Sequence, residues 1–352
     1  MQKIASQLFK WYDQHHRLLP WRTTPSEQKQ GIKADPYKIW LSEIMLQQTT
    51  VKTVKPYFTK FIQKWPNIQA LSAASQEDIL KEWSGLGYYS RARSLKSCAD
   101  QILSKYNGQF PKHAEKLRAL PGLGNYTAAA ISAIAFNQKE AVVDSNVQRV
   151  ITRLFLITTA LPFANKEIHQ YTRKITPYSR PGDFAQAMMD LGATLCTPKK
   201  PKCLICPLTK LCLALQKDNP ENFPKKNTIK KKELRTGNTF IALSENQRIF
   251  LQKRHQKGLL GGMSETPNHF AQEANKQDMA FAPFPALWVY QGDIHHIFSH
   301  FLLSMSVYMA TNLSENIGKK GWWVKIEDLT KEALPSLIKK AIKKALPDAF
   351  NL

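Results

Sequence analysis

The sequence predicts a multidomain protein, in which an all-α domain is followed by a smaller α+β domain. Apolar residues recur at helical spacing up to about residue 215. The stretch 217–236 is rich in proline, polar residues and lysine and shows no apolar periodicity. After it, short apolar runs separated by polar turns indicate strands. We therefore place a helical domain at 1–216, a basic linker at 217–236 and a second domain at 237–352.

The helices of the first domain are predicted from their caps and their periodicity. The segment 35–49 starts with Asp35 as N-cap and Pro36 at the first helical position. Trp40 and Ile44 then repeat at helical spacing, which puts Glu43 at the border of the apolar stripe. Further helices are predicted at 55–65, 75–83, 88–106 and 147–157.

The second domain combines strands with one basic helix. Residues 239–254 read as two strands around a tight polar turn, and 300–310 and 321–326 read as further strands. The segment 334–346 is an amphipathic basic helix. The pattern is that of an α+β domain.

The charge of the chain favours a polyanionic partner. Lys and Arg number 50 against 27 Asp and Glu, which gives a formal charge of +23. Nucleic acid is the first candidate and an anionic membrane surface the second, although charge alone would also suit a ribosomal or chaperone-like protein. No secretory signal and no membrane span is visible, so we expect a cytoplasmic protein that associates with the nucleoid through DNA.

Four of the five cysteines form a cluster with the spacing of metal ligands. They read Cys196-x6-Cys203-x2-Cys206-x5-Cys212, and Cys98 stands apart. Clustered cysteines in an intracellular chain indicate metal ligation rather than disulfides. Zinc would be the default metal from the spacing alone.

A glycine turn between two helical stretches marks a phosphate-binding hairpin. In LPGLGNYTAAAISAIAF, residues 120–136, Gly122 and Gly124 permit backbone angles that other residues avoid. Their amides and the following helix N-terminus suit an anion. The plain alternative is an ordinary helix-turn-helix connection. With its Leu-Pro-Gly-x-Gly context, the motif resembles the helix–hairpin–helix of base-excision DNA glycosylases.

Two carboxyl groups in unlike surroundings suggest acid-assisted cleavage of a glycosidic bond. Asp144 precedes a helix, where amides and the helix dipole favour its ionised form. Glu43 lies beside Trp40 and apolar neighbours, which should raise its pKa so that it can deliver a proton. The alternative for Asp144 is a purely structural N-cap, and the alternative for Glu43 is an ordinary solvated glutamate. One acid and one anion suit N-glycosidic cleavage.

The segments SEIMLQQT, GLGYYSRARSL, LPGLGNYTAAAI and VVDSNV together resemble the MutY-type adenine DNA glycosylases, over about residues 8 to 215. The resemblance implies a [4Fe–4S] cluster at the four cysteines and a role for Asn146 in orienting groups around Asp144. It also implies base-pocket and DNA-wedge residues, which are Trp21, Arg22, Gln186, Gln48 and Tyr88.

Tyr126 bears on the type of chemistry. Endonuclease III-type relatives carry a lysine there, whose amine forms a Schiff base and breaks the strand. Without that amine we predict a monofunctional glycosylase, in which the Tyr126 hydroxyl could support Glu43. Ser145 stands where the family usually has glycine, which would cost strain if that backbone needs a positive φ.

The second domain resembles the Nudix-like domain of the same family, which reads 8-oxoguanine. Phe298, Ser299 and His300 match its lesion-sensing loop. The acidic helix of pyrophosphate hydrolases is missing, and the run Ser264 to Thr266 replaces bulkier apolar residues. The resemblance implies a monomer that acts on duplex DNA with adenine opposite 8-oxoguanine or guanine.

The sequence also allows two other functions. An endonuclease III-like glycosylase and AP lyase would share the hairpin and the cysteines, but Tyr126 argues against it. A non-catalytic iron–sulfur DNA-binding protein would explain the charge, the hairpin and the cysteines, but it would not need Glu43 together with Asp144.

Overall fold

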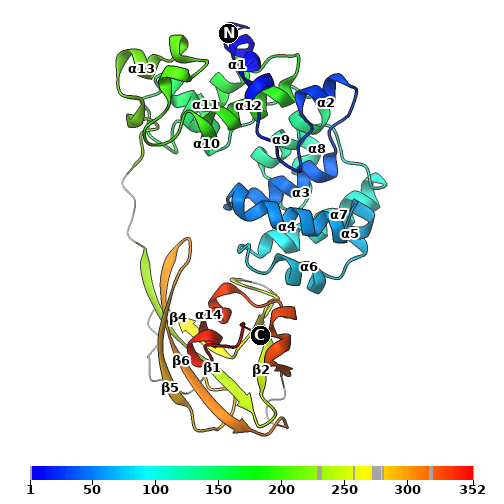
Figure 1. The fold of residues 1–352 in the computed structure, drawn as a ribbon, viewed down its shortest axis with the longest axis vertical. Coiled ribbons are helices and arrows are strands. Elements are labelled where there is room, and N and C mark those ends of the chain that lie inside the picture. The colour runs from blue at the N-terminus through cyan, green and yellow to red at the C-terminus, as the bar shows by residue number, and fades with distance from the viewer. Residues whose placement is uncertain are drawn as a thin grey trace. The chain divides into compact units, whose positions relative to one another are not determined.

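The computed structural model describes residues 2–227, 232–256, 258–271, 279, 281–316 and 320–351. The chain forms two compact units. The first comprises Met1–Ala73 and Ser94–Thr228, and the second comprises Ala74–Arg93 and Ile229–Leu352. The first is helical and the second is built on a mixed sheet (Figure 1). In the described part of the chain, no helix is both long and apolar enough to cross a membrane.

The first unit is a helical array, as predicted. The helices α10, α11 and α12 group with α1, whereas α3, α4, α8 and α9 form a second group (Figure 1). Contacts between α9 and α12 join the two groups. The elements up to the end of the cysteine region are α1 (Gln2–His15), α2 (Pro25–Lys29), α3 (Pro36–Leu46), α4 (Val51–Lys64), α5 (Ile68–Ala73), α6 (Gln76–Trp83), α7 (Ser90–Tyr106), α8 (Ala114–Arg118), α9 (Asn125–Phe136), α10 (Ser145–Leu154), α11 (Asn165–Ile175), α12 (Pro181–Thr194), η1 (Cys203–Ile205), η2 (Thr209–Leu211) and α13 (Leu213–Lys217), and α6 belongs to the second unit.

Helix α3 begins where its cap predicts. The Asp35 carboxylate accepts from the amides of Tyr37 and Lys38, and Pro36 takes the first helical position. Its burial is broader than the predicted stripe, because every residue from Ile39 to Met45 is buried. The prediction that Glu43 lies at the border of a stripe is therefore wrong. A helix enclosed by neighbours on all sides has no solvated face.

The hairpin between α8 and α9 depends on one glycine more than on the other. Gly122 has φ +77°, and a Cβ there would come within 2.7 Å of the Ser94 side chain. Gly124 has φ −78°, which any residue can adopt, and no atom lies within 4 Å of the place that a Cβ would take. A glycine is therefore not required there for its backbone angles, but it leaves the backbone accessible to a ligand. Gly182 of α12 lies against α9, where a Cβ would meet the Ala133 carbonyl at 2.6 Å.

The second unit is a seven-stranded sheet in the described residues, in the order β3-β2-β1-β6-β5, with β4 and β7 paired to β1 and β2. Strands β1 and β6 are parallel and the other pairs are antiparallel. Helix α14 packs on β1, β5 and β6. The bounds are β1 (Glu233–Ser244), β2 (Arg248–Lys253), β3 (Ser264–Glu265), β4 (Asn268–Ala271), β5 (Val289–Ile297), β6 (Phe301–Leu313), β7 (Trp322–Lys325), η4 (Ile326–Lys331) and α14 (Ser336–Ala345). The predicted α+β architecture is confirmed.

Both ends of the predicted linker 217–236 are structured. Phe223 is buried, and its carbonyl accepts from Arg153 Nε at 3.2 Å. The Leu161 amide donates to the Lys225 carbonyl at 2.9 Å. At the other end, β1 already begins at Glu233. Composition alone missed these contacts because their partners lie far away in the chain, and residues 228–231 lie outside the described residues.

The polar run at 264–266 is buried with polar partners. Ser264 Oγ donates to Glu332 Oε2 at 2.8 Å, and the hydroxyls of Thr266 and Thr239 lie 2.8 Å apart. Glu265 is also buried. A buried polar group costs little when it is hydrogen-bonded. The departure from apolar residues is therefore compensated within the unit.

We predict that Arg254→Met destabilises the second unit by about 3 kcal/mol, because it strands a buried carboxylate. Arg254 Nη1 lies 2.6 Å from Glu265 Oε2, and the Glu265 side chain is only 5% exposed. Urea unfolding followed by tryptophan fluorescence measures the loss. Arg248→Met is the control, since its partner Glu315 is more exposed and the loss should be smaller. Equal losses in the two variants would contradict the account.

Candidate active site

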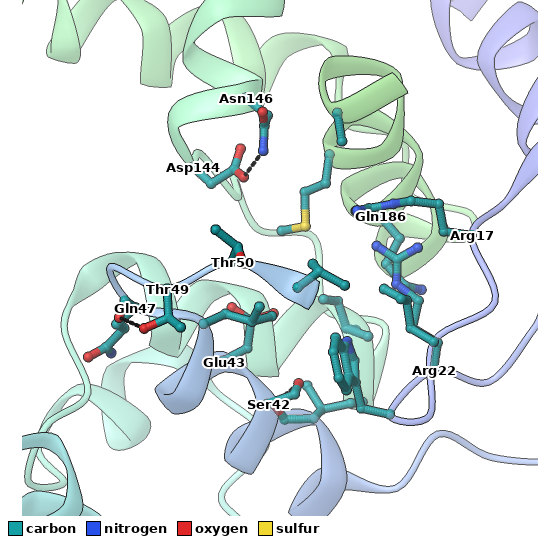
Figure 2. Close-up of a pocket in the computed structure, with 18 of the residues that line it drawn as sticks. Arg17, Arg22, Ser42, Glu43, Gln47, Thr49, Thr50, Asp144, Asn146 and Gln186 are labelled. Atoms are coloured by element: carbon teal, nitrogen blue, oxygen red, sulfur yellow. Dashed lines mark hydrogen bonds between the residues drawn. The ribbon is translucent and has the colours of Figure 1, made fainter. Parts of the chain in front are cut away.

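A cavity of about 540 Å³ lies in the helical unit and collects most of the predicted site residues. Its walls come from the segment before α2, from α3 and the turn after it, from α9, from the start of α10 and from α12. In Figure 2, Glu43 projects from α3 on one wall, Asp144 and Asn146 lie on another, and Arg17, Arg22 and Gln186 line a third. The predicted residues that line it are Trp21, Arg22, Glu43, Gln48, Tyr126, Asp144, Asn146 and Gln186.

Glu43 is buried, and the carboxylate of Asp144 acts on it from the same cavity. Its residue is only 6% exposed. Burial raises the pKa of Glu43 to about 7. The hydrogen bond with Tyr126 and the charge of Arg22 lower that pKa, whereas the charge of Asp144 raises it. Glu43 can therefore hold a proton close to neutral pH, as a general acid must.

Tyr126 engages Glu43 through a hydrogen bond. Burial raises the pKa of Tyr126 well above its ordinary value, so its hydroxyl stays protonated and can donate to Glu43. The ring of Trp40 packs against Tyr37 and Phe110. The predicted burial of Glu43 is present, and the Tyr126 hydroxyl lies where it can support Glu43, as expected from the sequence.

Asp144 is the N-cap of α10. Its Oδ1 accepts from the Val147 amide at 2.7 Å, and its Oδ2 accepts from Asn146 Nδ2 at 2.9 Å. Both donors hold the carboxylate in one direction at the N-terminus of the helix. Ser145 is the first residue of the helix, so the conditional cost of a positive φ does not arise there.

A hydrogen-bonded path leads from Asp144 to the cysteine region. Asn146, which donates to Asp144, accepts from Arg149 Nη2 at 2.9 Å. Arg149 Nε donates to the Cys196 carbonyl at 2.7 Å, and its Nη2 also donates to the Gly192 carbonyl at 2.6 Å. A Cβ at Gly192 would lie 2.6 Å from the Asn146 side chain, so the close approach of α12 needs that glycine.

The four clustered cysteines surround a small cavity, together with Arg153. Arg153 Nη1 donates to Cys196 Sγ at 3.4 Å and to the Thr197 carbonyl at 2.7 Å. A cationic donor beside a cysteine sulfur suits a metal-bound thiolate. Among the described residues, no group of three or more His, Cys, Asp or Glu side chains converges on a metal ion position. Four thiols that line one cavity are the ligand set that an iron–sulfur cluster uses.

The two predicted wedge residues share a strained backbone. Gln48 has φ +59° and Tyr88 has φ +49°, and both side chains are exposed. Non-glycine residues in this region occur where the surrounding structure holds them, often at functional sites. Gln48 lines the cavity of the helical unit, and Tyr88 belongs to the second unit.

The lesion-loop residues gather around a second cavity, of about 300 Å³, within the second unit. The hydroxyls of Tyr88 and Ser299 lie 2.7 Å apart, and Phe298 and His300 line the same cavity. Phe298 packs against Phe301 at 4.7 Å between ring centroids, so it is partly a core residue. Ser299 and His300 are exposed.

Three parts of the chain match known families. Residues 41–177 match the HhH-GPD superfamily of base excision DNA repair proteins, and residues 238–344 match the NUDIX domain. Residues 196–212 match the iron–sulfur binding domain of endonuclease III. An adenine DNA glycosylase of Mus musculus is 35% identical over 87% of this chain and 70% of its own length. One from Buchnera aphidicola subsp. Acyrthosiphon pisum (strain APS) is 33% identical over 99% of each chain. The chain belongs to the adenine DNA glycosylase family.

A solved structure agrees with a DNA glycosylase fold for the larger part of the chain. A thermostable thymine-DNA glycosylase is 32% identical, has a TM-score of 0.54, and covers 61% of this chain and 96% of its own. The predicted family, the two-part fold class and the DNA glycosylase class are confirmed. The iron–sulfur cofactor and DNA as a partner are confirmed too. The roles of individual residues stay predictions.

Several residues of this adenine DNA glycosylase family site were not predicted. Arg17 lines the cavity, Arg149 carries the path to the Cys196 carbonyl, and Arg153 donates to the Cys196 sulfur. The sequence could have indicated Arg149 and Arg153, because they lie one turn apart on α10 among apolar residues. An arginine that is buried there needs hydrogen-bond acceptors, so it should contact other parts of the chain. Arg17 and Asp190 gave no such signal, since they pair across 173 positions.

We predict that Cys203→Ala lowers the iron content of the purified protein, because a cluster needs its four thiolates. Iron analysis and the visible thiolate-to-iron absorbance measure the loss. Cys98→Ala is the matched control, since Cys98 is buried away from the cysteine cavity and should leave the iron content unchanged. A Cys203→Ala protein with full iron content would remove this cysteine from the ligand set.

Proposed function

We propose that the protein is a monofunctional glycosylase that releases adenine from duplex DNA in which adenine lies opposite 8-oxoguanine or, more weakly, guanine. The observation that carries the proposal is the convergence of Glu43 and Asp144 on one cavity. One carboxyl has its pKa raised to about 7, and the other caps a helix through two hydrogen-bond donors. An acid facing an anion suits cleavage of an N-glycosidic bond.

In the proposed reaction, Glu43 supplies the proton. It passes to a ring nitrogen of adenine as the bond between that base and the sugar breaks, so adenine leaves as a neutral molecule. The Tyr126 hydroxyl holds the carboxyl in place by its hydrogen bond. Water then adds to the sugar carbon, and its released proton restores Glu43. The products are free adenine and an intact strand with an abasic site.

Asp144 acts on the sugar. As the base leaves, positive charge develops on the deoxyribose ring, and a fixed carboxylate stabilises it or captures it for a short time. Asn146 and the Val147 amide keep the carboxylate oriented before the reaction begins, so little reorganisation is needed.

The cavity is suited to an extruded base. A target base must leave the stack to be reached, and 540 Å³ is within the usual range of a ligand pocket. Gln186 is buried, at 3% exposure, and lines this cavity. Its amide can both donate and accept, as the edge of adenine requires. Trp21 and Arg22 line the same cavity.

Selection of the opposite base is assigned to the second unit. Adenine is an ordinary base, so the decision to remove it must depend on its partner. The proposal gives this task to the cavity lined by Tyr88, Ser299 and His300, whose polar groups are exposed to a ligand. Its support is the proximity of Tyr88 to Ser299 and the match of this domain to the NUDIX family.

The other readings fit the site less well. A Schiff-base lyase needs an amine, and Tyr126 occupies the position that lysine takes in endonuclease III-type relatives. A non-catalytic DNA-binding protein would not require a protonated carboxyl facing a second one. A monomeric state and a cytoplasmic, nucleoid-associated location are parts of the proposal.

We predict that Glu43→Gln abolishes adenine release but keeps affinity for the duplex, because the amide cannot act as a general acid. Single-turnover assays on an A:8-oxoguanine duplex, with A:T and thymine-glycol duplexes beside it, measure release. Glu115→Gln, on the exposed side of α8, should behave as wild type. Full turnover in Glu43→Gln would remove this residue as the acid. Strand scission in step with base loss, or a borohydride-trapped complex, would favour a lyase.

We predict that the single-turnover rate of adenine release falls as pH rises through about 7. The active form of Glu43 is the protonated one, and its pKa is raised to about 7 from an ordinary value of 4.5. The acid is therefore present below pH 7 and is lost above it. Rates between about pH 6 and about pH 9 give the profile. A rate that stays constant over this range would contradict the assignment.

A further inference from the structure

Helix α12 carries two buried aspartates on one face, and they hold different parts of the unit. Asp183 and Asp190 lie two turns apart, which puts them on the same side of the helix. Their residues are 2% and 0% exposed. A buried carboxylate is stable only with cations or hydrogen-bond donors around it. The partners of each therefore indicate what each aspartate does.

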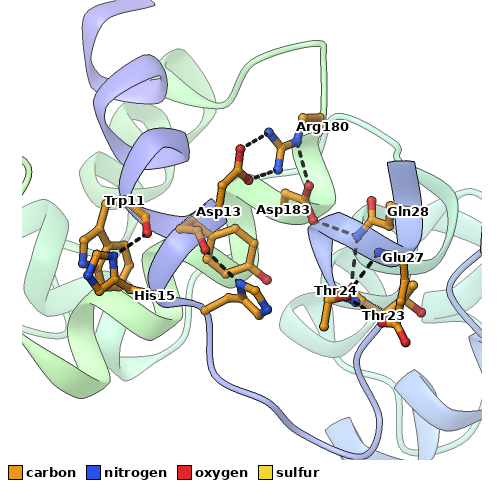
Figure 3. Close-up of polar contacts among 11 residues, drawn as sticks. Trp11, Asp13, His15, Thr23, Thr24, Glu27, Gln28, Arg180 and Asp183 are labelled. Atoms are coloured by element: carbon orange, nitrogen blue, oxygen red, sulfur yellow. Dashed lines mark hydrogen bonds and ion pairs between the residues drawn. The ribbon is translucent and has the colours of Figure 1, made fainter. Parts of the chain in front are cut away.

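Asp183 holds the entry of α12 and the short helix α2. Its Oδ2 accepts from Arg180 Nε at 2.8 Å, and its Oδ1 accepts from Gln28 Nε2 at 2.9 Å (Figure 3). Arg180 also pairs with Asp13 of α1. Neither Gln28 nor Arg180 lines the cavity of about 540 Å³. These contacts join elements of the scaffold.

Asp190 binds two arginines that do line the cavity. Its Oδ2 accepts from the Arg17 amide at 2.9 Å and from Arg22 Nη1 at 2.7 Å. Its Oδ1 accepts from Arg17 Nε at 2.6 Å. One carboxylate thus satisfies three donors from a segment that runs between α1 and α2 without regular helix. Figure 2 shows Arg17 and Arg22 together on the wall that also carries Gln186.

We propose that Asp190 is a positioning residue of the reaction, which acts through Arg17 and Arg22 to fix the wall of the base pocket and to balance their charge beside Glu43. This inference rests on the proposed function, because it assigns a role within that reaction. The irregular segment between α1 and α2 also carries Trp21, so the carboxylate orients a whole wall and not one side chain.

Three groups that face Glu43 affect its pKa. These are Tyr126 from α9, Asp144 from the start of α10, and Arg22 from the segment before α2. The positive charge of Arg22 lowers the pKa of Glu43. Asp190 is hydrogen-bonded to Arg22 and is negatively charged, so it offsets part of that effect. Loss of its charge should lower the pKa of Glu43 and weaken the acid at neutral pH.

The test compares Asp190→Asn with Asp183→Asn in single-turnover adenine release across pH. Both variants remove one negative charge from a buried aspartate of α12, so they are matched in chemistry. We expect Asp190→Asn to slow release by about tenfold or more, since misplaced pocket groups cost rate. We also expect its rate to fall at a lower pH than in the wild type. Asp183→Asn should lower the thermal midpoint and leave the pH of the fall unchanged.

A double variant covers the case in which Asp190→Asn does not fold, because stranding a buried cation can unfold a protein. Asp190→Asn/Arg17→Met removes the Asp190 carboxylate together with one of its two arginine partners. Arg17 is chosen because its side chain is more exposed than that of Arg22. The rate should stay low and should still fall at a lower pH than in the wild type, because Arg22 faces Glu43 and still lacks its anchor.

The results separate this inference from the proposed function. A wild-type protein that releases no adenine would overturn the function itself. The positioning role alone would be overturned if the wild type is active and the two variants Asp190→Asn and Asp183→Asn release adenine at the same rate, with the rate falling at the same pH. If Asp190→Asn does not fold, a double variant with the wild-type rate would overturn it.

Discussion

The proposed chemistry depends on a carboxyl group that is buried opposite a second carboxyl group. Glu43 lies in an enclosed helix wall, and the negative charge of Asp144 across the cavity makes ionisation of Glu43 harder still. Burial and a like charge act in the same direction on its pKa, while Arg22 and Tyr126 act against them. The balance leaves an acid that can keep its proton near neutrality, where an exposed glutamate would have lost it.

Much of the helical unit serves to hold the second carboxylate still. The cap of α10 fixes Asp144, Asn146 continues the contact, and Arg149 joins Asn146 to the carbonyl of Cys196. The iron–sulfur region is therefore part of the same hydrogen-bonded structure as the cavity. A cluster that closes the loop 196–212 would stabilise the far end of this path. Its role in that case is structural and needs no electron transfer.

The sequence allowed the fold class, the hairpin and the two carboxyls to be predicted, because each depends on local pattern or on a short motif. Asp35 caps α3 as its position predicts, and Gly122 adopts a positive φ. The full burial of Glu43 was harder to predict, because it depends on how other segments pack around α3. Asp190 was missed because its pairing with Arg17 spans 173 positions, and such contacts leave no local signal.

The protonation of the Glu43 carboxyl can be measured without turnover. Carbon-13 NMR of a labelled Glu43 carboxyl, followed through a pH titration of the wild type and of Asp144→Asn, measures it directly. The account predicts a midpoint near 7 in the wild type and a lower one in Asp144→Asn, where the facing charge is gone. A wild-type midpoint near 4.5 that does not change in the variant would contradict it.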